Sequence, residues 1–182
     1  MRVLVILGGI GDAKWPLPAT IDAATLAAHA AAHAVLSPFD EAALEVALKL
    51  RDRHADTRID VLVAGSDALA RTAAGLRADS VRCIRLTQAQ AWDCTAVARE
   101  LAALVAAGGA SPDLVLVGRE FGDFDDGSVP AALAEALRMP YVALAWAVEM
   151  ADATVQATRQ RGADLERVEP PLPALVSITN HT

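Results

Sequence analysis

Short apolar runs alternate along the chain with longer stretches of helical periodicity. The apolar runs predict six strands, over residues 3–7, 59–63, 81–86, 114–117, 141–147 and 174–178. Four helices are expected between them: one that begins after Ser37, and others over residues 67–78, 95–107 and 129–137. Residues 154–160 are expected to add an antiparallel edge strand. The pattern predicts an α/β fold, with a mainly parallel, Rossmann-like sheet and helices on both faces, as a single domain over residues 1–182.

Composition and charge exclude several classes of protein. Hydrophobic residues make up 54% of the sequence and aromatic residues only 4%, which is typical of closely packed, alanine-rich helices and not of a disordered chain. The 16 basic residues are outnumbered by 23 acidic ones and form no cluster, so we expect no nucleic-acid partner. We also expect no membrane span and no signal peptide. Two isolated cysteines, Cys83 and Cys94, fit a reducing compartment, so a cytoplasmic location is expected.

Ligands of parallel sheets bind at the carboxyl ends of the strands, and two loops there carry candidate chemistry. The loop that begins at Gly8 resembles a dinucleotide-binding loop, but Lys14 stands where that fingerprint needs its third glycine. The loop over residues 118–128 carries three glycines and leads into a helix, whose free N–H groups could bind an anion. His29 and His33 have the spacing of metal ligands on a helix but lack a third ligand, so no metal site is predicted.

A third candidate is the helix start at Ser37, which precedes Pro38 at the first helical position and Asp40 three residues after the cap. This pattern is also that of an ordinary helix cap, and Phe39 beside it could simply be a core aromatic residue. The acidic residues of the 118–128 loop could likewise be turn formers. Both interpretations stay open on the residues alone.

Four segments resemble the motifs of one family, in the same order and over nearly the whole chain. Ser37–Glu45 is similar to N-P-F-D-E-x-A-L-E, and Pro112–Arg119 to P-D-L-V-L-x-G-R-Q. Asp123–Gly127 occupies the place of D-x-D-T-G-Q, and Val168–Val176 is similar to a V-P-L-P-A-V-V strand. By these motifs the chain resembles the beta subunits of electron transfer flavoproteins, which bind an adenosine nucleotide and pair with an FAD-carrying alpha subunit.

The resemblance implies an adenine nucleotide alpha hydrolase-like fold, with AMP lying across the carboxyl ends of the first, second and fourth strands. Backbone groups near Ile6 and Ala64 would hold the base and ribose, together with those of Ser37, Pro38, Phe39 and Asp40. The loop over residues 118–129 would wrap the phosphate. Gly118, Arg119, Asp123 and Asp125 would lie in its turn, and the N–H groups of Gly127, Ser128 and Val129 would face the ligand.

In function, the resemblance implies an electron carrier and not an enzyme. An alpha-type subunit would hold FAD and receive electrons from flavin dehydrogenases; whether the nucleotide in this chain is AMP or a second FAD stays open. Family members continue past the last strand as an arm that grips the alpha subunit, whereas this sequence stops at Thr182. We therefore expect either an alpha-type partner that supplies the lost contacts or a homodimer of the isolated chain through the alanine-rich residues 23–34. The alternative is a stand-alone adenine-nucleotide-binding protein of the same fold.

Overall fold

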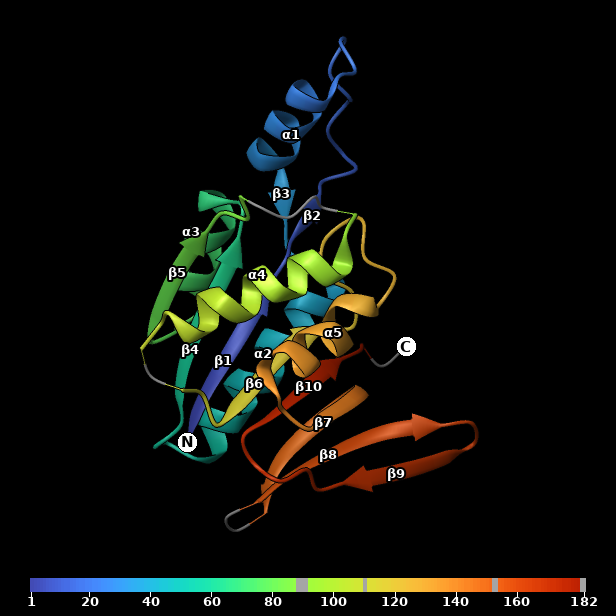
Figure 1. The fold of residues 1–182 in the computed structure, drawn as a ribbon. Helices are drawn as coiled ribbons and strands as arrows, with labels where there is room; N and C mark the ends of the chain where they lie inside the picture. Colours follow the sequence, from blue (N-terminus) through green and yellow to red (C-terminus); the bar gives the residue numbers. More distant parts are fainter. Residues whose placement is uncertain (88–91, 110, 152–153, 181–182) are drawn as a thin grey trace.

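An eight-stranded sheet forms the centre of the molecule in the computed structural model, which describes residues 1–87, 92–109, 111–151 and 154–180 (Figure 1). From one edge to the other, its strands are β5 (Ser80–Ile84), β4 (Arg58–Ala64), β1 (Arg2–Leu7), β6 (Leu114–Gly118), β10 (Ala174–Ile178), β7 (Tyr141–Ala151), β8 (Thr154–Arg161) and β9 (Asp164–Val168). The first six are parallel to one another, and β8 and β9 are antiparallel to their neighbours. This confirms the predicted mainly parallel α/β fold.

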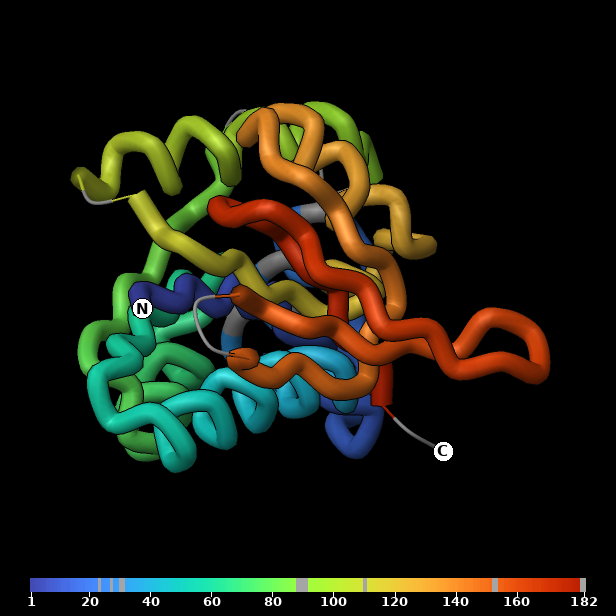
Figure 2. Tube along the Cα trace, turned by 90° about the horizontal axis from the view of Figure 1, so that it is seen from below, coloured from blue at the N-terminus to red at the C-terminus, as the bar shows by residue number. Residues whose placement is uncertain are grey.

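Helices cover both faces of the sheet (Figure 2). On one face lie α2 (Pro38–Arg53) and α3 (Asp67–Gly75), and on the other lie α4 (Cys94–Ala106) and α5 (Ser128–Leu137). Each face has its own core, with Leu44 and Leu50 of α2 in one and Leu101 and Leu133 in the other. Because β6 is covered on both sides, all five of its residues are buried, which explains its unbroken apolar sequence.

All six predicted strands and all four predicted helices are present, with ends that differ by a few residues. The expected edge strand is β8, which pairs antiparallel with β7. The sequence analysis missed β9, which pairs with β8 to form a hairpin that extends away from the helical layers (Figures 1 and 2). Three of its five residues are charged, and the adjacent Glu166 and Arg167 break the alternation that would indicate a strand.

Residues 10–35 form a projection from the carboxyl edge of the sheet (Figure 1). Its base is an antiparallel pair of two short strands, β2 (Ile10–Gly11) and β3 (Ala34–Val35), and above it lies α1 (Ala23–Ala32). Alanine is a strong helix former, which favours a helix in this alanine-rich stretch. The ring of Trp15 stacks on that of His33 at 4.3 Å between centroids. The side chains of residues 23, 27, 30 and 31, which belong to the expected self-association surface, lie outside the described residues.

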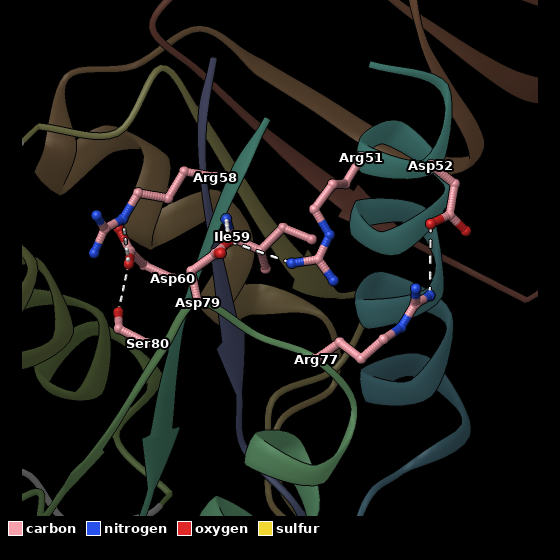
Figure 3. A network of polar contacts seen from close by, with 8 residues as sticks. All are labelled: Arg51, Asp52, Arg58, Ile59, Asp60, Arg77, Asp79 and Ser80. Carbon is pink, nitrogen blue, oxygen red and sulfur yellow. Dashed lines mark hydrogen bonds and ion pairs between the residues drawn. The ribbon is translucent and has the colours of Figure 1, made fainter. Parts of the chain in front are cut away.

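At the amino edge of the sheet, two aspartates hold strand ends together (Figure 3). Asp79 accepts hydrogen bonds from the N–H of Ile59 at 2.7 Å and from Arg51 at 3.3 Å, so it joins the start of β5 to β4 and α2. Asp60 accepts from Arg2 and Arg58, and from the hydroxyl of Ser80.

Burial raises the pKa of Asp60, but hydrogen bonds from Ser80, Arg2 and Arg58 outweigh it, so the pKa lies below its usual value of 3.8. The carboxylate is therefore charged wherever the protein is folded near neutral pH.

Among the helices of the described residues, none is long and apolar enough to cross a membrane.

Candidate functional site

A cleft of about 530 Å³ opens at the carboxyl ends of β1, β4, β5 and β6. It lies where the chain order reverses, because β4 follows on one side of β1 and β6 on the other. Such a switch point is where open parallel sheets bind their ligands. Four loops supply most of its lining: residues 8–11 after β1, 64–66 after β4, Arg85 and Leu86 after β5, and 121–124 after β6.

The glycines after β1 are required by packing. A Cβ on Gly8 would lie 2.6 Å from the backbone nitrogen of Gly122, and one on Gly9 would lie 2.2 Å from a methyl carbon of Leu69. Gly9 also has a left-handed backbone with φ +66°. The two glycines therefore let the β1 loop lie directly against the β6 loop and α3, which shapes the floor of the cleft.

Asp40 fastens this loop to α2. Its carboxylate accepts hydrogen bonds from the N–H groups of Gly8 at 3.2 Å, Gly9 at 2.9 Å and Ser37 at 3.1 Å, while Ser37 caps the helix by accepting from the N–H of Asp40. Asp40 is only 1% exposed. Burial raises its pKa above the usual value, although the three N–H groups and the Ser37 hydroxyl work in the opposite direction.

The predicted binding residues at the start of α2 therefore hold the loop that lines the cleft and do not line the cleft themselves. Ser37, Pro38, Phe39 and Asp40 are not among the residues that line the cleft in the described part of the chain. Phe39 is half-buried and lies 2.9 Å from where a Cβ on Gly118 would stand, so Gly118 is needed for α2 to approach β6. Ile6 is fully buried in β1, and Ala64 lines the cleft at the end of β4.

The N–H groups at the start of α5 already have an acceptor within the chain. One carboxylate oxygen of Asp125 accepts from Gly127 at 3.0 Å, Ser128 at 2.8 Å and Val129 at 3.1 Å, and the other accepts from Phe121 at 2.8 Å. Asp125 is 9% exposed. An internal carboxylate thus occupies the N–H groups that the resemblance assigns to phosphate.

The charged side chains of this loop are also paired. Arg119 forms an ion pair with Glu120 at 2.7 Å, and its guanidinium carbon lies 4.9 Å from the ring centroid of Phe39. Asp123 lines the cleft and accepts a hydrogen bond from the N–H of Gly11 at 2.9 Å, which joins the β6 loop to the base of the projection.

Sequence reasoning did not single out several side chains that line the cleft, among them Arg85, Phe121 and Phe124. Arg85 follows directly on β5, and a basic residue immediately after a parallel strand is a signal that could have found it. Phe124 is 65% exposed, whereas Phe121 is 8% exposed and belongs to the core beneath α4 and α5.

Side chains of Cys94, Asp125 and Asp126 form a group of three possible metal ligands, whose donor atoms lie within 4.8 Å of one another. Burial and the carboxylates of Asp125 and Asp126 raise the pKa of the Cys94 thiol, which disfavours the thiolate that metals bind. The oxygens of Asp125 also already accept four backbone N–H groups. The chemistry of this group does not favour a metal.

Comparison with known proteins agrees with the motifs. The family described as Electron transfer flavoprotein domain matches residues 25–182. An electron transfer flavoprotein subunit beta of Syntrophomonas wolfei is 34% identical over 153 residues, which cover 82% of this chain and 59% of that protein. One of Dictyostelium discoideum is 29% identical over 145 residues, covering 78% and 56% respectively.

An α/β sheet with a cleft at its switch point is the arrangement in which open parallel sheets commonly bind their ligands at strand ends. The chain belongs to the electron transfer flavoprotein beta-subunit family. It spans a little under three-fifths of the length of the two curated relatives.

Proposed function

We propose that this chain is the nucleotide-binding part of an electron transfer flavoprotein beta subunit. In this proposal it pairs with an alpha-type subunit that carries FAD, and the pair passes electrons from flavin dehydrogenases to an acceptor in the cytoplasm. The flavin supplies the electron-carrying chemistry. The observation that carries the proposal is the cleft at the switch point of a chain that belongs to this family.

The residues of this chain would bind and orient an adenine nucleotide, with AMP as the preferred ligand. Backbone groups of residues 8–11 and 64–66 line the cleft, and the exposed ring of Phe124 offers a face for a base. Gly65 leaves room for a ligand, because a Cβ there would have no atom within 4 Å. Asp40 and Asp125 would act as positioning residues, since each holds a wall of the cleft from behind.

Calorimetry of the purified chain with AMP, ADP, FAD and adenosine tests nucleotide binding. We expect AMP to bind, and binding of none of the four up to millimolar concentration would contradict the proposal.

Co-expression with an alpha-type subunit from the same genome tests the pairing. A yellow complex that contains both chains is expected. Nucleotide binding by a chain that ignores the alpha-type subunit and forms a homodimer in light scattering would instead support the stand-alone nucleotide-binding protein.

A further inference from the structure

The projection over residues 10–35 leaves the sheet and returns to it at one buried carboxylate. The side chain of Asp40 accepts hydrogen bonds from the N–H of Gly9 at 2.9 Å, where the chain leaves β1, and from the N–H of Ser37 at 3.1 Å, where the chain enters α2. Both ends of the projection are therefore fixed to the same side chain. They form a single attachment point, about which the remainder of the projection can turn.

Contacts within the projection join it into one unit. At its base β2 pairs with β3, and the N–H of Asp12 donates to the carbonyl oxygen of His33 at 2.9 Å. Farther from the sheet, the ring of Trp15 stacks on that of His33, and Nε2 of His29 donates a hydrogen bond to the carbonyl oxygen of Pro16 at 2.9 Å. The segment before α1 is thus tied to α1 itself, so the projection can move as a body.

The base of the projection also forms part of the cleft wall. Ile10, Gly11 and Ala34 line the cleft, together with residues 121–124 of the β6 loop. These two parts of the wall are joined by a hydrogen bond in which the carboxylate of Asp123 accepts the N–H of Gly11 at 2.9 Å; we call this bond the latch. The latch is exposed to solvent, and one hydrogen bond of this kind contributes little to stability. It can therefore open without unfolding either part of the wall.

We propose that the projection is a gate to the nucleotide cleft, which turns at its attachment point on Asp40 and is held closed by the latch. A nucleotide enters and leaves while the latch is open. Asp123 is then a positioning residue, because it sets the rates of entry and release by holding the projection against the β6 loop. The proposal rests on the proposed function, since the gate controls the same cleft, and it leaves the phosphate at the loop over residues 118–129.

Stopped-flow fluorescence with mant-AMP, a fluorescent derivative of AMP, measures entry and release on the full chain. For Asp123→Ala we expect both rate constants to rise about fivefold, the factor expected for the loss of one hydrogen bond, so that Kd changes less than either rate. A side chain that only shaped the site would instead weaken binding through faster release alone. Asp123→Asn should recover most of the slow rates, because its amide oxygen can still accept the N–H of Gly11.

Asp12→Ala is the matched control. The carboxylate of Asp12 accepts the N–H of Lys14 within the projection, and Asp12 is not among the residues that line the cleft in the described part of the chain. This variant removes one acidic side chain of the projection but keeps the latch. The rates of entry and release of mant-AMP should therefore stay those of the unaltered chain.

A covalent lock tests the gate in the opposite direction. A Cβ on Gly11 would lie 3.7 Å from a carboxylate oxygen of Asp123, so cysteines at these two positions would face each other. In the double variant Gly11→Cys, Asp123→Cys, a disulfide detected by mass spectrometry would hold the gate closed. We expect it to slow the release of bound mant-AMP at least tenfold, and reduction of the disulfide should restore fast release.

Three results would overturn the gate while the proposed function stands. The first is binding of mant-AMP to Asp123→Ala with unchanged rate constants. The second is a loss of affinity in that variant as large as its gain in release rate, which would mean that entry is not gated. The third is equal release from the oxidised and reduced double variant. If the unaltered chain binds neither AMP nor mant-AMP, the proposed nucleotide function itself fails, and the gate fails with it.

Discussion

The amino and carboxyl ends of the parallel strands, here called the amino and carboxyl edges of the sheet, use aspartates in different ways. At the amino edge, Asp60 and Asp79 pair with arginine side chains from neighbouring strands and α2. At the carboxyl edge, Asp40, Asp123 and Asp125 accept backbone N–H groups of loops. Both edges thus tie chain segments together, and at the carboxyl edge none of these three aspartates forms an ion pair with another described residue.

The difference bears on how each end of the sheet is built. At the amino ends, ion pairs join long side chains of different elements, as Arg77 and Asp52 do in Figure 3. At the carboxyl ends, backbone donors occupy no additional space, and Asp40 and Asp125 hold their loops without being among the residues that line the cleft in the described part of the chain.

The largest effect on stability is expected from removing the carboxylate of Asp125, which accepts four backbone hydrogen bonds. Asp125→Ala leaves four backbone N–H groups without their acceptor, three of them at the start of α5. Each unsatisfied buried donor is destabilising, and water will replace part of the loss, so we expect the free energy of unfolding to fall by about 3 kcal/mol. Urea unfolding followed by circular dichroism measures this change.

Asp126→Ala is the matched control, because its exposed carboxylate contacts the hydroxyl of Ser128. It should change stability by less than about 0.5 kcal/mol. Equal effects of the two alanine variants would show that the carboxyl edge does not depend on its internal acceptor.

The comparison also predicts opposite pH behaviour for one aspartate of each edge. Hydrogen bonds from Ser80, Arg2 and Arg58 lower the pKa of Asp60 in spite of its burial, whereas burial raises the pKa of Asp40. Carbon-13 NMR titration of the carboxyl groups should therefore find Asp60 below and Asp40 above their common usual value of 3.8.

The signs for stability follow from linkage. The contribution of Asp60 is present above pH 3.8, where the unfolded group is ionised, and is lost as the pH falls through its lower folded pKa. For Asp40 the relation is reversed, so its contribution is present below pH 3.8 and is lost as the pH rises through the raised folded pKa. If Asp60 and Asp40 titrated with the same pKa, as two aspartates of an unfolded peptide do, that result would contradict the difference between the edges.

The smallest effect concerns Arg77, at the amino edge. Arg77 has a left-handed backbone with φ +65°, and its ion pair with Asp52 is long, at 3.5 Å, and largely exposed. Arg77→Gly removes the strain, while the greater freedom of glycine in the unfolded chain offsets part of the gain. Because the exposed pair contributes little, we expect a stabilisation of about 0.5 kcal/mol, seen as a higher midpoint in urea. A lower midpoint would show that the ion pair outweighs the strain.

Local signals in the sequence predicted most of the fold. The apolar runs that become β1 and β6, and the Ser37–Asp40 pattern that becomes a capping box, are each encoded within a few residues. The site was harder to predict, because its contacts join residues far apart in the chain. That Asp40 would hold Gly8 and Gly9, or that Arg85 and Phe124 would line the same cleft, depends on how the strands are ordered in the sheet. The role of Asp125 depends on the backbone path of its own loop.

The β8–β9 hairpin has a consequence for how the protein behaves in concentrated solution. Strand β9 is the last of its sheet, so on its outer side its backbone can pair with a strand of another molecule, and such edges promote aggregation. Charged side chains gather there: Glu166 pairs with Arg159 and Arg161, and Asp164 and Glu166 flank the exposed Leu165. Bringing two such edges together would remove water from these charges, and that desolvation opposes uncontrolled growth of the sheet from one molecule to the next.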